Sequence, residues 1–407
     1  MSIERLLDRF LRYVQVDTTA RDGGDQYPSS PGQLDLGQML VAELRQCGIE
    51  AVQDEFGIVL ATVPGTVEGP TIAFCAHLDT SPETTGAGVR PQVVRNYAGG
   101  PIVLPGDPDQ VIRPEESPEL LQLIGKTLVT SDGTTLLGAD DKAGVAAIME
   151  AAQRMAEDRS LRHGPIRLAF TCDEEIGRGV EHLAPRRLGA VVCYTLDGQG
   201  ADEIDVETFS ADLAIVTIRG VNVHPGVAKG RMTNAVRTAG RFLELLPQTR
   251  LSPETTEQRQ GFLHPYEITG GVAEARLRIL LRDFDVEGLR RHAELLRHAA
   301  ALVEAEFPAA RCEIVLREQY RNMAAGLTKE PRAAAYAEEA LARLGRQANR
   351  TIVRGGTDGS RLTELGLPTP NLSTGEHSPH SPLEWACLEE IEQAVEWILA
   401  IARRWSE

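Results

Sequence analysis

The stretch that decides the fold is IRLAFTCDEE, residues 166–175, in which a short apolar run ends in three consecutive acids. Other apolar runs of similar length alternate with helical patterns through the first half of the chain, which favours a mostly parallel, buried sheet. The sequence therefore predicts an α/β fold, with that sheet flanked by helices. Asp173, Glu174 and Glu175 form either a solvated turn or a site, because three adjacent carboxylates repel one another unless a positive charge lies nearby.

The ends of the neighbouring apolar runs favour a site. TIAFCA is followed by His77 and Asp79, TLLGA by Asp140 and Asp141, and VVCYTL by Asp197. In an open α/β sheet, ligands bind at the carboxyl ends of the strands. Acidic and imidazole groups gathered at that edge would be strongly self-repelling without cations. The sequence therefore predicts a divalent metal centre there.

The number of ligands favours two ions. Imidazole and carboxylate together suit Zn²⁺, with Co²⁺ or Mn²⁺ as alternatives. The late segment LSTGEHSPHSPLEW offers two further histidines, and the residues alone do not decide between them. Two metals about 3.5–4 Å apart can activate a water and polarise a carbonyl together. The expected division is His77, Asp140 and Asp197 for one ion, Glu175 with His377 or His380 for the other, and Asp140 as the bridge.

Two acids next to these ligands have a different expected role. Asp79 lies two residues from His77 on the same face of an extended segment, where its carboxylate can accept the second N–H of the imidazole. A lone His-x-Asp is more often a surface turn, but the other strand ends favour the functional interpretation. Of the adjacent glutamates only one can be a tight ligand, because neighbouring side chains diverge. Glu174 is then the general base and Glu175 the ligand.

The pattern changes near residue 208, where longer strands alternate with long helical segments as far as about residue 320. The earlier alternation then resumes. We therefore expect an inserted α+β domain of typical size, 208–320, between two parts of one larger domain, 1–207 and 321–407. Residues 86–130 are rich in Pro, Gly and Asp and are expected to form a long surface excursion.

Composition narrows the classes of protein. The 407 residues carry a net charge of −17, which disfavours a nucleic-acid or anionic membrane surface, although solubility alone explains most of such a charge. No apolar stretch is long enough to span a membrane, and the amphipathic start, MSIERLLDRFLRYV, lacks the features of a signal peptide. The six cysteines form no CxxC pair and are expected to be reduced thiols of a cytoplasmic protein.

The motifs HLDT, LLGADDKAG, FTCDEEIGRG and YTLDG, together with a late histidine, resemble the di-zinc exopeptidase family, which contains carboxypeptidase G and succinyl-diaminopimelate desuccinylase. PEESPEL, GVNVHPGVAKGRMTNA, RDFD and RGGTDGSRLTELGLPTPNLSTG extend the resemblance to the tripeptide aminopeptidases of that family, along essentially the whole chain. The resemblance implies a hydrolase of small peptides with two zinc ions per subunit. A deacylase or an exopeptidase acting on peptides of another length stays open as the alternative. A catalytically silent metal-binding protein is disfavoured, because the base is present.

The resemblance also assigns individual residues. It implies metal ligands at His77, Asp140, Glu175, Asp197 and His380, a base at Glu174 and a supporting carboxylate at Asp79. His380 is favoured over His377 because the spacing from His380 to Glu384 is that of the family.

The inserted domain resembles a lid that also forms a homodimer, on a catalytic domain made of 1–207 and 321–407. Within the insertion, the resemblance implies that His224 polarises the scissile carbonyl and that Asn234 and Arg282 bind polar groups of the substrate. The chain departs from the family at residues 375–380, GEHSPH, through Glu376 and Pro379, which leaves the substrate preference open.

Overall fold

The computed structural model describes residues 2–407, and of Ser2 only the backbone. The chain divides into two compact units. The first contains the chain up to Val206 together with Met323–Thr351 and Thr357–Glu407, and the second contains Glu207–Asn322 with Ile352–Gly356. Residues 352–356 therefore lie in the second unit, although the sequence pattern places them in the segment 321–407.

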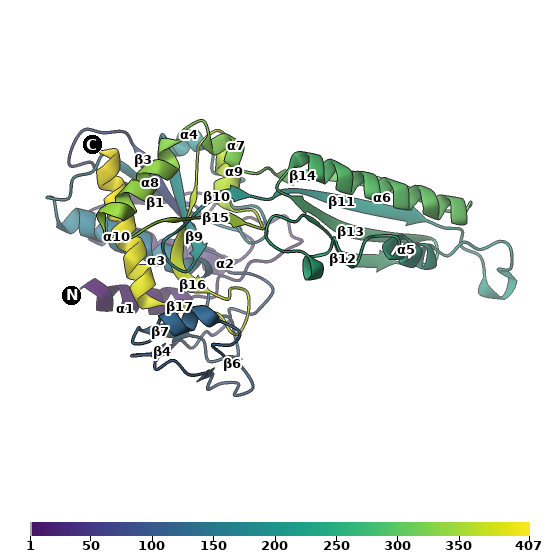
Figure 1. The fold of residues 1–407 in the computed structure, drawn as a ribbon, viewed down its shortest axis with the longest axis horizontal. Coiled ribbons are helices and arrows are strands. Elements are labelled where there is room, and N and C mark those ends of the chain that lie inside the picture. The colour runs from purple at the N-terminus through teal and green to yellow at the C-terminus, as the bar shows by residue number, and fades with distance from the viewer. Residues whose placement is uncertain (1) are drawn as a thin grey trace. The chain divides into compact units, whose positions relative to one another are not determined.

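The first unit is built on an eleven-stranded sheet (Figure 1). Its strands are β1 (Glu50–Gln53), β2 (Val59–Val63), β3 (Ile72–His77), β4 (Gln92–Val94), β7 (Leu128–Thr130), β8 (Ile166–Thr171), β9 (Cys193–Gln199), β10 (Glu203–Thr208), β15 (Asn349–Val353), β16 (Asn371–His377) and β17 (Trp385–Cys387). The main path runs β1-β2-β8-β3-β9-β16-β17-β7-β4, and β10 pairs with β15 and β16. The α/β class expected from the sequence is confirmed.

The sheet is mixed, which corrects the expectation of mostly parallel strands. The central strands β8, β3, β9 and β16 pair in parallel. The outer pairs β1–β2, β2–β8, β16–β17, β17–β7 and β4–β7 are antiparallel. Short connections, such as residues 54–58 between β1 and β2, allow only antiparallel pairing, whereas parallel pairs need a long crossover.

Helices cover both faces of the central strands. They are α1 (Ser2–Val14), α2 (Pro31–Gln46), α3 (Ala139–Glu157), α4 (Pro185–Leu188), α7 (Ala324–Leu327), α8 (Arg332–Arg343), α9 (Asp358–Glu364) and α10 (Leu388–Trp405). All six residues of β3 are buried. Phe74 points into the larger core with α1, α3 and α10, and Cys75 points into the smaller core with Leu188 of α4 and Leu362 of α9. Burial on both faces explains why the run reads as continuously apolar.

One glycine lets a helix lie very close to the sheet beside the strand ends. A Cβ at Gly144 of α3 would stand 1.8 Å from the carbonyl oxygen of Leu196 in β9. Any side chain at this position would therefore separate α3 from β9. The residues that follow Leu196 and those that begin α3 are thereby held next to one another.

The segment 86–130 is more than a surface excursion. It contains β4, β5 (Ile102–Val103), β6 (Val111–Ile112), the 3₁₀ helix η1 (Pro118–Gln122) and β7. Tyr97, Leu104 and Leu120 form a small core with Leu128 and Trp385. Its apolar residues are widely spaced, so periodicity alone does not reveal this core.

The second unit is a four-stranded antiparallel sheet covered by helices. The strand order is β12 (Phe262–Gly270), β13 (Glu274–Asp283), β11 (Ser210–Arg219) and β14 (Arg311–Tyr320), so β12 and β14 are the edges. The helices α5 (Ala235–Glu244) and α6 (Val286–Glu306) bury one face, and η2 (Pro225–Val227) and η3 (Pro253–Thr255) lie in connections. None of the helices within residues 2–407 combines the length and apolarity that a membrane span requires.

Candidate active site

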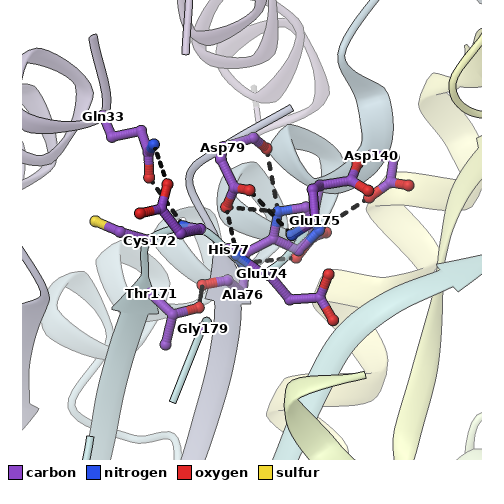
Figure 2. Close-up of polar contacts among 12 residues, drawn as sticks. Gln33, Ala76, His77, Asp79, Asp140, Thr171, Cys172, Glu174, Glu175 and Gly179 are labelled. Atoms are coloured by element: carbon purple, nitrogen blue, oxygen red, sulfur yellow. Dashed lines mark hydrogen bonds and ion pairs between the residues drawn. The ribbon is translucent and has the colours of Figure 1, made fainter. Parts of the chain in front are cut away.

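The expected site residues of the first unit follow three adjacent parallel strands. His77 is the last residue of β3, Glu174 and Glu175 follow β8, and Asp197 lies in β9. Asp140 is at the start of α3. The peptide bond between Asp140 and Asp141 is cis. Because β8, β3 and β9 are parallel neighbours, their carboxyl ends meet at one edge of the sheet. Figure 2 shows the side chains of His77, Asp140, Glu174 and Glu175 gathered there.

Two groups of potential metal ligands share Asp140. In the first, His77 Nε2 lies 2.9 Å from Asp140 Oδ1 and 3.5 Å from Asp197 Oδ1. In the second, His380 Nε2 lies 3.0 Å from Glu175 Oε2 and 3.3 Å from Asp140 Oδ2. Within each group the ligand atoms lie within 4.8 Å of one another. The structure thus brings all five expected ligands together, and His380 is the late histidine that joins them.

Burial makes this charge cluster unfavourable without a cation. Burial raises the pKa of Glu175 to about 8, and the charge of Asp140 acts in the same direction. Burial would lower the pKa of His77, but its hydrogen bonds to Asp140 and Asp197 outweigh that effect and raise the pKa well above its ordinary value. The carboxylates around His77 therefore favour a positive charge at this place, which a bound cation can supply instead of the proton on the imidazole.

One buried carboxylate oxygen in the second group also favours a bound cation. Among residues 2–407, Glu175 Oε1 is buried and has no hydrogen-bond partner. A buried polar atom without a partner costs about 1–3 kcal/mol. Imidazole and carboxylate donors in this arrangement suit Zn²⁺ and similar ions, so the residues present fit a divalent cation in each group.

Asp79 contacts more than the imidazole. Its main-chain oxygen lies 3.1 Å from His77 Nδ1 and its carboxylate Oδ1 lies 3.4 Å from the same atom. The two carboxylate oxygens accept the main-chain N–H groups of Glu174 and Glu175, both at 3.0 Å (Figure 2). Asp79 therefore orients His77 and also holds the turn that carries both glutamates.

Glu174 differs from Glu175 in its surroundings. Within the described residues, the carboxylate of Glu174 makes no hydrogen bond or ion pair, whereas Glu175 pairs with His380. Burial raises the pKa of Glu174 well above its ordinary value; the charge on His77 opposes this rise and Asp197 reinforces it. Glu174 thus offers an unoccupied carboxylate beside the two groups.

The third acid of the run, Asp173, points to a different partner. The backbone of Asp173 is left-handed, with φ +61. Its carboxylate accepts hydrogen bonds from the Ser29 N–H and from Gln33 Nε2, both at 2.7 Å. The main-chain N–H of Asp173 in turn donates to Gln33 Oε1 at 3.0 Å. The repulsion of three adjacent acids is avoided because Asp173 faces the start of α2. This role was missed, since nothing in the local sequence indicates the Ser29 and Gln33 contacts.

Within the departure at residues 375–380, Glu376 and His377 are buried, whereas Pro379 is partly exposed. Glu376 is 2% exposed, and together with Asp141 and Asp197 it forms a third group of close acidic oxygens. His377 is also buried; its Nε2 lies 2.7 Å from Glu390 Oε2 and its ring stacks on Trp385. His377 is therefore outside the two groups that share Asp140.

The expected residues of the insertion belong to the second unit. His224 Nδ1 accepts the Gly226 N–H at the start of η2. Asn234 caps α5, and its Oδ1 accepts the N–H groups of Val236 and Arg237. Arg282 Nη1 lies 3.4 Å from the carbonyl oxygen of Arg354, and its Nε is buried without a partner among the described residues.

Comparison with known proteins identifies the family of this chain. Residues 126–404 match the model of the peptidase family M20/M25/M40. The chain belongs to this family. It is 42% identical to Peptidase T of Bacillus subtilis over 404 residues, and 40% identical to Peptidase T of Halothermothrix orenii over 400 residues. Each alignment covers 98% of both proteins. The resemblance drawn from the motifs is thereby confirmed.

Solved structures share the M20/M25/M40 fold. Aminopeptidase PepT from Bacillus cereus superposes with a TM-score of 0.76 at 23% identity, covering 100% of this chain and 99% of the other. A Bacillus subtilis protein described as a dinuclear metal binding peptidase from the M20 family has a TM-score of 0.65 at 17% identity, with 98% and 97% coverage. At these identities the likeness shows the fold alone.

Proposed function

We propose that this member of the M20/M25/M40 family is a metal-dependent aminopeptidase that releases the N-terminal residue of tripeptides. The observation that carries the proposal is the pair of ligand groups joined through Asp140 at the carboxyl edge of the sheet. The substrate class is supported by relatives that are named Peptidase T and are about 40% identical over nearly the full chain.

Two divalent cations belong to this proposal, with zinc preferred and cobalt or manganese as alternatives. His77, Asp140 and Asp197 would hold one, and Asp140, Glu175 and His380 the other. The unpartnered Glu175 Oε1 supports this assignment. Cations bound there would supply a water of lowered pKa and polarise the scissile carbonyl.

Glu174 is the proposed general base. Its carboxylate has no other partner in the described chain, and its backbone is fixed through Asp79. It would take a proton from the water as the water oxygen bonds to the carbonyl carbon. When the C–N bond breaks, Glu174 would pass that proton to the leaving amine. Asp79, which accepts the Glu174 N–H, would keep the base in place without taking part in proton transfer.

The second unit carries the proposed substrate contacts. His224 would donate a hydrogen bond to the carbonyl oxygen as it becomes negative. Because the helix cap occupies Asn234 Oδ1, a substrate would meet the amide nitrogen of Asn234. The charged and incompletely bonded guanidinium of Arg282 suits a carboxylate of the peptide.

A panel of peptides tests the substrate class. The same fold occurs in proteins described as an amidase of the hydantoinase/carbamoylase family and as an aminoacylhistidine dipeptidase, so the fold does not decide the substrate. Di-, tri- and tetrapeptides with free and acetylated N-termini would be assayed with Zn²⁺, Co²⁺ and Mn²⁺. We expect fastest release of the first residue from free tripeptides. Preferred hydrolysis of N-acylated substrates would replace the proposal by a deacylase.

Substitution of the base tests the mechanism in the same assay. Glu174→Gln should retain the metals and lose about 10²–10⁴-fold in kcat, the usual cost of removing a general base. Glu175→Gln should instead weaken metal binding. Near-wild-type turnover by the Glu174→Gln variant would show that another group is the base.

A further inference from the structure

Glu384 is a fully buried carboxylate that the proposed mechanism does not use. It is 1% exposed and lies between β16 and β17, four residues after His380. Its Oε2 accepts the main-chain N–H groups of Leu137 and Gly138 at 2.8 and 2.7 Å. Its Oε1 accepts the N–H of Asp140 at 3.0 Å. Both oxygens are therefore occupied by the loop that ends in Asp140.

These bonds join two segments that are almost 250 residues apart in sequence. The loop 137–140 carries Asp140, and the segment 380–384 carries His380; with Glu175 these two residues form the second ligand group. His380 Nε2 lies 3.3 Å from Asp140 Oδ2. The connection between the three loop N–H groups and the imidazole is short, because only residues 381–383 separate His380 from Glu384.

A second contact fixes the imidazole end of the connection. Thr84 Oγ1 donates a hydrogen bond to the carbonyl oxygen of His380 at 2.6 Å, and the neighbouring Thr85 carbonyl accepts the Leu136 N–H at 3.1 Å. His380 itself has φ +65, a left-handed backbone that a non-glycine residue adopts at a cost. His380 Nδ1 also lies 3.3 Å from Glu83 Oε2. The position of His380 is therefore imposed by its surroundings, to which Glu384 contributes through the short backbone segment between them.

We propose that Glu384 is a positioning residue that sets the separation of Asp140 and His380 and thereby the affinity of the second ligand group for its cation. The inference rests on the proposed two-cation function. A carboxylate suits this position because two oxygens with several lone pairs can accept three N–H groups at once. A glutamine offers one oxygen, so its NH₂ group would face either the Asp140 N–H or the pair from Leu137 and Gly138.

The effect of losing Glu384 is unequal between the two groups. In the second group, both Asp140 and His380 are carried by segments that Glu384 joins. In the first group, only Asp140 is carried by a segment that Glu384 contacts. His77 and Asp197 lie on β3 and β9, which the central sheet holds in position. Supporting residues of this kind are typically worth about 10–100-fold in metal affinity. That loss falls mainly on the group that contains His380.

Glu389 provides a matched control five residues away. Its carboxylate also accepts a main-chain N–H, that of Thr127, through both oxygens at 3.1 and 2.9 Å. Thr127 precedes β7 and belongs to neither ligand group. Glu389→Gln therefore weakens the same type of contact without touching the loop 137–140.

The test is a calorimetric titration of the metal-free protein with Zn²⁺. A second titration with Co²⁺ is followed by the absorption spectrum of the bound Co²⁺. We expect two binding events in the wild type, one of them weakened by about 10–100-fold in Glu384→Gln, and both unchanged in Glu389→Gln. Thermal unfolding of the metal-free variants shows whether the two substitutions disturb the fold equally. If Glu384→Gln does not fold, Glu384→Asp keeps the charge but shortens the reach, and the same selective loss is expected.

Two results would overturn the role of Glu384: wild-type affinity for both ions in the foldable Glu384 variant, or an equal loss in the Glu389 control. A wild-type protein that binds no cation would instead overturn the proposed function, and the role of Glu384 with it. The two failures are distinguished by the titration of the wild type alone.

Discussion

The carboxylate oxygen Oδ1 of Asp79 accepts the main-chain N–H of Glu174 at 3.0 Å. This bond joins the end of β3 to the turn after β8, where the proposed base lies. The same carboxylate also holds the next residue of the turn and lies near His77, so one buried acid contacts the proposed base and two proposed metal ligands. Its position explains why an acid that binds no cation belongs to the site.

Asp79→Asn should lower kcat/KM by about 10–100-fold, the usual effect of changing a group that orients metal ligands. The single side-chain oxygen of an asparagine can accept only one of the two N–H groups, that of Glu174 or that of Glu175. Its NH₂ group would then face the other N–H. Steady-state kinetics with a tripeptide would measure the loss. Asp132→Asn is the control, because Asp132 is also buried and accepts the Thr134 N–H at 3.0 Å in another loop. Equal activities of the two variants would contradict the role of Asp79.

Breaking a buried ion network should destabilise the first unit strongly. The side chain of Glu150 in α3 is fully buried and pairs with Arg5, Arg9 and Arg154. Glu150→Ala should lower the free energy of unfolding by about 3–5 kcal/mol, because it leaves the buried Arg9 with less compensation. Glu157→Ala, which removes an exposed partner of Arg5, should cost less than about 1 kcal/mol. Denaturant unfolding of both variants measures the difference, and equal losses would contradict it.

The same residue predicts a dependence of stability on pH. Burial would raise the pKa of Glu150, but its hydrogen bonds to Arg5 and Arg154 outweigh burial and hold the pKa below its usual 4.5. Its contribution is therefore complete above pH 4.5 and is lost as the pH falls through the folded-state pKa. In metal-free protein, Glu150→Gln should flatten the loss of stability on acidification. A wild-type acid profile in this variant would remove Glu150 as a source of the dependence.

The contrast between Asp79 and Asp173 shows what the sequence can and cannot predict. His77, Asp79 and Asp197 were predictable, because each lies at the end of an apolar run and the carboxyl ends of parallel strands meet at one edge. Asp173 was not, since its partners, Ser29 and Gln33, lie about 140 residues away and nothing local indicates them.

The strands of the sheet also differ in how well the sequence predicts them. The central strands could be predicted from their short, continuously apolar runs, which are typical of strands buried on both faces. The antiparallel strands β4, β7 and β17 have three residues each, too few to show a period. The place of Glu384 was also hidden, because its three N–H partners are main-chain groups that any sequence would supply.

His224→Ala should lower kcat while leaving metal content unchanged, because the proposed role of His224 concerns the transition state and none of the ligand groups contains it. Kinetics and metal analysis of the same preparation would measure both quantities. His298→Ala is the control, since His298 is an exposed residue of α6 in the same unit. A wild-type kcat in the His224→Ala variant would remove His224 from the mechanism.

The second unit should also support a homodimer. β12 is an edge strand, and its Ile268 is exposed, so this edge of the sheet can pair with a second copy. Light scattering should give twice the mass of one chain. A mass equal to one chain would remove the dimer and leave the catalytic proposal intact.

The most direct test of the central claim is the metal content of protein purified without chelator. The account predicts two divalent ions per chain, and loss of both from Asp140→Asn, because Asp140 alone belongs to both groups with a histidine. Activity should disappear when the ions are removed and return when Zn²⁺, Co²⁺ or Mn²⁺ is restored. Metal content near zero, with peptide hydrolysis retained in strong chelator, would contradict the account.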